Sequence, residues 1–215
     1  WEKYDVEDFT YERFLTSPRA RAQTWRLFME ETFWKARANP AHHALAELEQ
    51  IGKLDCVITQ NIDSLHQAAG NSPEKVIELH GTARWVYCLD CGARFPSEEI
   101  YERILKENLE IPDCGACGGT LKQAVIAFGE PMPEAELMEA ERRARCCDLL
   151  IVVGSSLVVF PAALIPLEAA RNGAKLAIIN VEPTPQDGVA EIVISGKAGD
   201  VLPELVRQVK AGLGG

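Results

Sequence analysis

The sequence lacks several features that would place it in a protein class at once. It has no run of about 18 apolar residues, so no segment is expected to cross a membrane. Its first residues, Trp1–Tyr4, include no apolar stretch of the kind found in signal peptides, so none is expected there. Neither a Walker A motif nor the pattern G-x-G-x-x-G occurs, which excludes the commonest glycine-rich phosphate loops. Internal repeats and low-complexity tracts are also absent.

Positive charge is scarce as well. The 215 residues include 22 Lys and Arg against 32 Asp and Glu, which gives a net charge of −10. Such a balance disfavours direct contact with nucleic acid and suits a basic partner, such as a lysine-bearing peptide. With 47% hydrophobic and 25% charged residues, the composition is that of a globular chain that can bury a core.

Short continuous runs of Val, Ile and Leu indicate strands that are buried on both faces of a parallel sheet. They are Leu54–Ile58, which is interrupted only by Asp55, and Leu149–Val153, Leu176–Ile179 and Ile192–Ile194. Helical segments with capping signals alternate with most of these runs. We expect helices from Ser17-Pro18 to about Ala38, from Asn39-Pro40 to Gln50, after Pro133, from Pro161 to Asn172, and from Pro203 onward. This alternation predicts an α/β fold with a doubly wound, Rossmann-like parallel sheet.

Four of the seven cysteines form two C-x-x-C pairs, in a stretch rich in glycine and polar residues. The pairs are Cys88/Cys91 and Cys114/Cys117. Four thiolates on two tight turns make a closed tetrahedral site, so we predict structural zinc in an inserted zinc-ribbon module. A redox-active pair or two disulfides are the alternatives. Cysteine usage of this kind favours a reducing compartment, and we expect a cytoplasmic protein.

The other three cysteines carry no such pattern. Cys56 is expected in a strand, and Cys146 and Cys147 at the end of a helix. Core packing is the predicted role for all three.

Polar residues follow three of the predicted strands, where open α/β sheets bind ligands. Asn61 and Asp63 follow the first, Gly154-Ser155-Ser156 the second and Asn180 the third. Each has an ordinary alternative, since Asn61 or Asp63 could cap a helix and Gly154 could simply form a turn. His80, beside Gly81, is either a satisfied structural histidine or a general base.

Taken in order, these segments resemble the sirtuins, a family of NAD-dependent protein-lysine deacylases. The resemblance rests on Gln60-Asn61-Ile62-Asp63, His80-Gly81, the two C-x-x-C pairs, Phe128-Gly129-Glu130, Gly154-Ser155-Ser156-Leu157 and Ile179-Asn180. It covers the chain from Trp1 to about Leu205. It implies a Rossmann-like NAD-binding domain at residues 1–82 and 121–215, with a helical insertion within 1–52, and a zinc-binding module at 83–120.

The resemblance also implies a role for each matching residue. His80 and Asn61 are the implied catalytic residues. Contacts to NAD are implied for Gln60, Asn61, Ile62, Asp63, Gly154, Ser155, Ser156, Asn180, Val181, Glu182 and Ala198. Contacts to the acyl-lysine peptide are implied for Ile126, Phe128, Gly129, Glu130, Leu157, Val158 and Val159, although by residue type alone core packing is the better explanation for the apolar members. The implied zinc ligands are Cys88, Cys91, Cys114 and Cys117.

The reaction that the family resemblance implies consumes NAD. The oxygen of the acetyl-lysine carbonyl attacks the anomeric carbon of the nicotinamide ribose, and nicotinamide leaves. His80 then acts as general base on a ribose hydroxyl, and water completes the transfer. The products are free lysine and O-acetyl-ADP-ribose. The implied partner is an acetylated lysine peptide or protein. Binding to a membrane or directly to nucleic acid is not expected, and a monomer is favoured.

Two departures from the family pattern matter. Sirtuins begin with a strand and with Gly-Ala-Gly-Ile-Ser and Asp-Phe-Arg segments that are absent here, so we expect the natural protein to be longer. Sirtuins that prefer succinyl-lysine or malonyl-lysine resemble one another in a Tyr-x-x-Arg pair on one helix. The matching segment here, Trp25–Phe33, lacks that pair. We therefore predict an acetyl or another apolar acyl substrate. ADP-ribosyl transfer to protein, and a zinc-ribbon binding module without catalysis, remain alternative functions.

Overall fold

The computed structural model describes residues 6–30 and 35–214. They form two compact units. The first, here called the antiparallel unit, comprises Trp1–Ala36, Asn61–Ser64 and His80–Pro133. The second, the parallel unit, comprises Arg37–Gln60, Leu65–Leu79 and Glu134–Gly215. The separate zinc-binding module at 83–120 stays a prediction. Among residues 6–30 and 35–214, no helix combines the length and the apolar character that crossing a membrane requires.

Parallel pairing holds the sheets of the parallel unit together. Strands β6 (Leu149–Val153), β7 (Lys175–Asn180) and β8 (Ile192–Ser195) form one sheet in that order. A second parallel pair joins β1 (Val57–Thr59) to β2 (Val76–Glu78). The predicted parallel pairing is thus confirmed, with three changes. Strand β1 was expected in the same sheet as the other runs and lies instead in a separate two-stranded sheet. Strand β2 was not predicted, and β1 begins at Val57 rather than Leu54 because only three of its residues have partners on β2.

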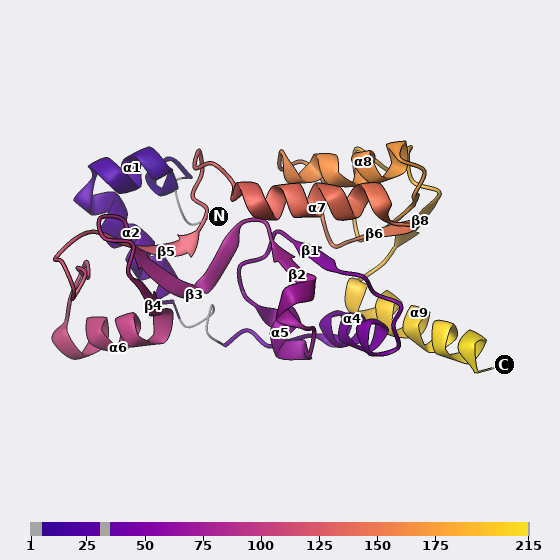
Figure 1. Cartoon of the computed structure of the whole chain (residues 1–215), viewed down its shortest axis with the longest axis horizontal. Helices are drawn as coiled ribbons and strands as arrows, with labels where there is room; N and C mark the ends of the chain where they lie inside the picture. Colours follow the sequence, from indigo (N-terminus) through magenta and orange to yellow (C-terminus); the bar gives the residue numbers. More distant parts are fainter. Residues whose placement is uncertain (1–5, 31–34, 215) are drawn as a thin grey trace. The chain divides into compact units, whose positions relative to one another are not determined.

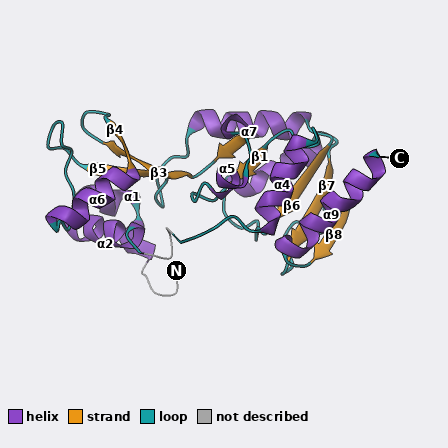
Figure 2. Ribbon diagram, turned by 90° about the horizontal axis from the view of Figure 1, so that it is seen from below, coloured by secondary structure: helices purple, strands orange, loops and turns teal. Residues whose placement is uncertain are grey.

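Helices cover both faces of the three-stranded sheet, as a doubly wound fold requires. Helices α4 (Pro40–Gln50) and α9 (Ala198–Leu213) pack together on the face that carries Ile179. On the face that carries Ile178, the packing includes Ala163 of the 3-10 turn η3 (Ala162–Leu164), which leads into α8 (Ile165–Arg171). Figure 1 shows α8 beside α7 (Glu134–Cys146), and Figure 2 shows α4 and α9 against the sheet. The parallel unit is completed by α5 (Leu65–Ala69) and the turn η2 (Pro73–Lys75).

Two helix boundaries illustrate how capping and packing compete with sequence signals. The predicted start of α4 is confirmed, since the Asn39 Oδ1 accepts hydrogen bonds from the backbone N–H groups of Ala41 and His42 at 2.9 and 3.2 Å. The predicted start of α9 at Pro203 is wrong, because the helix begins at Ala198. Leu202 and Val206 are fully buried in the cluster that includes α4, and burial of two such side chains contributes about 3 to 6 kcal/mol, which offsets the roughly 3 kcal/mol that a proline inside a helix costs.

An antiparallel sheet organises the other unit. Strand β3 (Gly81–Cys88) lies between β4 (Arg94–Pro96) and β5 (Leu121–Val125). Around it lie the 3-10 turn η1 (Val6–Phe9) and the helices α1 (Tyr11–Thr16), α2 (Pro18–Phe28) and α6 (Ser97–Glu107). The core joins Trp25 of α2, Val86 of β3 and Ile104 of α6. Helix α2 ends at Phe28, not near Ala38 as predicted, and residues 31–34 of that prediction lie outside the described part of the chain.

The three remaining cysteines are only partly explained by core packing. Cys56 lies just before β1 and is half-buried, and burial raises the pKa of its thiol to about 11. Cys147 is also half-buried, and its thiol donates a hydrogen bond to the carbonyl of Ala144. Cys146 is exposed, so the prediction that it packs in the core is wrong.

Candidate functional site

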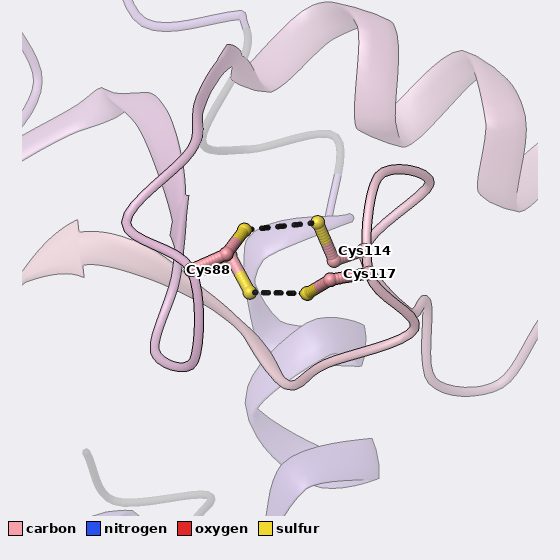
Figure 3. Close-up of side chains that lie close together, drawn as sticks. Cys88, Cys114 and Cys117 are labelled. Carbon is pink, nitrogen blue, oxygen red and sulfur yellow. Dashed lines mark hydrogen bonds between the residues drawn. The ribbon is translucent and has the colours of Figure 1, made fainter.

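The four paired cysteines come together in the antiparallel unit. Their sulfur atoms all lie within 4.8 Å of one another. Two separations are 3.5 Å, between Cys88 and Cys117, and 3.8 Å, between Cys91 and Cys114 (Figure 3). Four sulfurs at about 2.3 Å from a tetrahedral zinc ion lie about 3.8 Å apart, so this arrangement fits zinc. A disulfide needs about 2.0 Å, and all four residues are free thiols.

The two C-x-x-C turns have matching backbone geometry. Gly92 donates its N–H to the carbonyl of Cys88 at 3.0 Å, and Gly118 donates to that of Cys114 at 2.7 Å. Both glycines have a φ of +73°, a left-handed conformation that few other residues tolerate. Gly119 donates its N–H to the Cys117 sulfur at 3.3 Å, the kind of contact that stabilises a thiolate ligand. The sequence folds into two equivalent knuckles because each pair is followed by a glycine at the same spacing.

His80 lies directly before β3 in the antiparallel unit. Its backbone carbonyl accepts a hydrogen bond from the N–H of Ile126 at 3.0 Å. The neighbouring residue, Gly81, has a φ of +73°, and a Cβ atom there would lie 2.1 Å from the carbonyl oxygen of Ala124. Two predicted site residues, His80 and Ile126, are therefore adjacent through their backbones, and the close approach depends on a glycine at position 81.

Gly81→Ala is expected to destabilise the protein by about 3 kcal/mol, because it adds a steric clash to an unfavourable backbone conformation. Urea unfolding of the purified protein measures this change. Gly92→Ala is the matched control, because its φ is also +73° and no atom lies within 4 Å of the added Cβ. Equal losses of stability in the two variants would contradict the role given to the Ala124 carbonyl.

The segment Asn61–Ser64 is hydrogen-bonded to the start of β3. Ala83 donates its N–H to the carbonyl of Ile62 at 2.9 Å, and the hydroxyl groups of Ser64 and Thr82 lie 3.0 Å apart. Asn61 is exposed, whereas Ile62 and Asp63 are half-buried. The structure thus brings the predicted catalytic pair, His80 and Asn61, onto two segments that are hydrogen-bonded to each other.

A second predicted segment, 126–130, turns sharply after β5. Phe128 is 45% exposed and Gly129 has a φ of +76°. The side chain of Glu130 is buried and paired with Lys122 at 2.8 Å. Phe128 and Gly129 are therefore the members of this segment that face solvent.

In the parallel unit, the predicted ligand-binding turns meet at one edge of the sheet. Val153 pairs with Ile179, and Asn180 pairs with Ser195, so the carboxyl ends of β6, β7 and β8 are aligned. Gly154 donates its N–H to the carbonyl of Ile179 at 2.9 Å and has a φ of +60°. Such an edge, with glycine and hydroxyl groups, can bind phosphate and ribose.

The remaining predicted residues of this unit differ in exposure. Ser156, Val158, Val159, Val181 and Glu182 are exposed, Ser155, Asn180 and Ala198 are half-buried, and Leu157 is buried. The side-chain amide of Asn180 donates to the carbonyl of Glu182 at 2.8 Å. Ala198 is the first residue of α9, whose amino end therefore lies close after β8. Gln60 directly follows β1.

Sequence patterns do not single out Ser64, Thr82 or Lys122, although all three support the predicted site. Ser64 and Thr82 are small polar residues that meet across 18 positions of sequence. Lys122 lies within a strand, and nothing in the neighbouring sequence distinguishes it from a lysine that faces solvent. Ser195 also ends a strand at the predicted ligand-binding edge, and this polar position is the one signal that could have drawn attention to it.

Comparison with known proteins agrees with this geometry. The model of the Sir2 family matches residues 1–161. The NAD-dependent protein deacetylase of Thermodesulfovibrio yellowstonii is 44% identical over 213 residues, covering 98% of this chain and 81% of that protein. The NAD-dependent protein deacylase 2 of Archaeoglobus fulgidus is 46% identical over 213 residues, with the same shares covered.

A solved structure supports the same assignment. The structure of Sir2Af2 bound to a myristoylated histone peptide has a TM-score of 0.81 and 45% sequence identity. The match covers 94% of this chain and 84% of the other. By family model, sequence and structure, this chain belongs to the Sir2 family.

Proposed function

We propose that this chain is an NAD-dependent protein-lysine deacetylase that transfers an acetyl group from lysine to ADP-ribose, releasing nicotinamide. One geometric observation supports the assignment of catalytic roles to His80 and Asn61. The segment that carries Asn61 is hydrogen-bonded to the start of β3, directly after His80, through the contact from Ala83 to Ile62. A histidine and an amide held on joined segments provide a proton acceptor and a polar group that can orient a sugar.

NAD is the co-substrate in this proposal, and residues of the parallel unit are suited to bind its phosphate, ribose and adenosine portions. A Cβ at Gly154 would meet no atom within 4 Å, so the backbone of this turn is open to a ligand. We assign contacts with phosphate and ribose to Gly154, Ser155 and Ser156, and contacts with the adenosine portion to Asn180, Val181, Glu182 and Ala198. NAD supplies an anomeric carbon from which nicotinamide can leave.

The antiparallel unit supplies the proton chemistry of the proposal. His80 acts as the general base that removes a proton from a ribose hydroxyl, because neutral imidazole is the side-chain base best matched to physiological pH. Asn61, with Ile62 and Asp63, orients the nicotinamide ribose, and we assign a further contact with NAD to Gln60, which precedes them in sequence and belongs to the parallel unit. Asn61 is an exposed residue, which is compatible with contact to a ligand.

Two segments bind the acyl-lysine peptide in the proposal. Ile126 and Phe128–Glu130 provide one, and Leu157–Val159 provides the other, each adding to an extended peptide by β-augmentation. Phe128 exposes an apolar side chain on the first segment, and Val158 and Val159 do so on the second. Cys88, Cys91, Cys114 and Cys117 hold zinc, which is structural because four protein ligands leave no position for a substrate.

A nicotinamide-release assay tests the proposed function. The purified protein is incubated with NAD, with and without an acetyl-lysine peptide, and nicotinamide and free lysine are quantified. Release that depends on the acetylated peptide, with equal amounts of nicotinamide and free lysine, is the expected result. Labelled ADP-ribose covalently bound to protein would instead indicate ADP-ribosyl transfer.

We expect removal of acetyl groups to be at least about tenfold faster than removal of succinyl groups from the same peptide sequence. No Tyr-x-x-Arg pair occurs on the helical segment that would contact a dicarboxylic acyl chain. Arg26 is paired with Glu110, and the guanidinium of Arg21 donates to the carbonyls of Phe14 and Leu15. The measurement is kcat/KM for the two peptides, and faster removal of succinyl groups would contradict this prediction.

The proposed substrate and cell compartment are supported by a related structure and by the state of the cysteines. One related structure contains an acylated peptide, which supports an acetylated lysine peptide or protein as the substrate here. All seven cysteines are free thiols, which supports a reducing compartment, and we propose a cytoplasmic, monomeric enzyme.

A further inference from the structure

A buried ion pair lies beneath the exposed residues Phe128 and Gly129. The Nζ of Lys122 is 2.8 Å from an Oε2 of Glu130, and the two side chains are only 4% and 9% exposed. The pair between Arg143 and Asp55, by comparison, leaves 30% and 67% of its side chains exposed. Lysine and glutamate are rarely buried, because removing two charges from water costs several kcal/mol per ion in typical proteins.

The surroundings of Lys122 compensate for its burial. Its ammonium group donates to the carbonyl of Val125 at 2.6 Å and to that of Gln123 at 3.4 Å. The aromatic rings of Tyr11 and Tyr87 lie with their centroids 5.7 and 5.6 Å from the same nitrogen. Burial lowers the pKa of Lys122, and the carboxylate of Glu130 opposes that change. The ammonium group is thus held by β5, by β3 and by the start of α1.

The carboxylate of Glu130 closes the turn that carries Phe128. Its Oε2 accepts a hydrogen bond from the N–H of Ala127 at 2.8 Å, and its own N–H donates to the Ala127 carbonyl at 3.0 Å. The hydroxyl of Tyr87 donates to Oε1 at 3.5 Å. Because Phe128 and Gly129 lie between these two anchor points, their backbone conformation depends on the side chain of Glu130.

A second anchor acts on the backbone of Phe128. Its carbonyl accepts a hydrogen bond from the N–H of Tyr11 at 2.9 Å, within a parallel bridge to Thr10. This contact occupies one edge of the segment, so an added peptide must use the opposite edge. Tyr11 therefore contacts the segment directly and also places its ring next to Lys122.

We propose that Lys122 and Glu130 are positioning residues for the acyl-lysine peptide, holding Phe128 and Gly129 in the conformation that accepts it. This inference rests on the proposed function. Stability by itself does not account for the pair, because apolar residues of similar volume replace buried ion pairs at little or no cost in many proteins. A preformed turn, by contrast, lowers the entropy lost when a peptide binds.

Two variants test the proposal in the full-length protein. Glu130→Gln keeps the size of the side chain and its oxygen acceptor, and Lys122→Met with Glu130→Met replaces both charges by apolar groups. We expect the KM for an acetyl-lysine peptide to rise at least about tenfold in both variants, with the KM for NAD changed by less than about twofold. Asp55→Asn, which removes the partly exposed pair with Arg143, is the control and should leave both values unchanged. Lys122→Arg with Glu130 intact should retain most of the peptide affinity.

Hydrogen exchange separates this inference from the proposed function. The backbone amides of residues 126–130 should exchange at least about tenfold faster in both variants, whatever the activity of the protein. Unchanged exchange, or a peptide KM within about twofold of wild type in a folded variant, would overturn the positioning role. If the double variant does not fold, Glu130→Gln decides by the same two criteria. A wild-type protein without NAD-dependent deacetylation would overturn the proposed function, while the exchange result would still judge the role of the ion pair.

Discussion

Replacing His80 by alanine is expected to lower kcat/KM for deacetylation by about 10³-fold, because general-base catalysis contributes about 10²- to 10⁴-fold in enzymes. The loss should appear with the acetylated peptide and NAD both saturating, since the imidazole is proposed to act on the reacting sugar and not in peptide binding. Zinc content and the urea concentration at half-unfolding should stay close to wild type. The measurement is initial-rate kinetics of nicotinamide and lysine release.

His43→Ala is the matched control for this variant. His43 is exposed on α4, so the same substitution there should leave the rate within about twofold of wild type. A His80→Ala protein that deacetylates at the wild-type rate would exclude His80 as the base. A protein that never deacetylates but binds peptide equally well with either residue would indicate a zinc-ribbon binding module.

The parts of the fold that the sequence predicts are those fixed by local signals. Continuous apolar runs predict the strands β6, β7 and β8. The expected burial on both faces is wrong for β8, where Ile192 and Val193 are 55% and 46% exposed. Asn39-Pro40 predicts the start of α4, because a cap and an N1 proline act within one turn. Two C-x-x-C pairs predict the metal cluster for the same reason, since each knuckle is complete within five residues.

The parts that the sequence does not predict depend on contacts between distant residues. Strand β2 is only three residues long and is defined by its pairing with β1. Helix α9 begins before Pro203 because Leu202 and Val206 are buried in the cluster that includes α4, and together they offset the usual cost of a proline inside a helix. The ion pair of Lys122 and Glu130 is not predicted for a related reason. Lysine and glutamate are usually solvent-exposed, so their residue types do not reveal that these two are buried. Burial and partners at long range are properties of the folded chain, and residue spacing does not encode them directly.

Loss of one buried zinc ligand is expected to have the largest effect on stability. Cys114→Ser should destabilise the protein by more than about 4 kcal/mol, because serine is a poor zinc ligand and structural zinc contributes directly to folding. Cys114 is 2% exposed and lies in the core of the antiparallel unit, so the substitution also leaves a polar hydroxyl among Val86, Ile104 and Leu121. Urea unfolding and zinc content per chain measure the effect.

Cys146→Ser makes the same chemical change at an exposed thiol and should alter stability by less than about 0.5 kcal/mol. A zinc chelator should reproduce the effect of Cys114→Ser on the wild-type protein, whereas a thiol reductant should have no effect. This contrast follows from the sulfur separations of 3.5 and 3.8 Å, which suit a shared metal ion and exceed the length of a disulfide. Destabilisation by the reductant, or equal stability of the two serine variants, would contradict a structural zinc site.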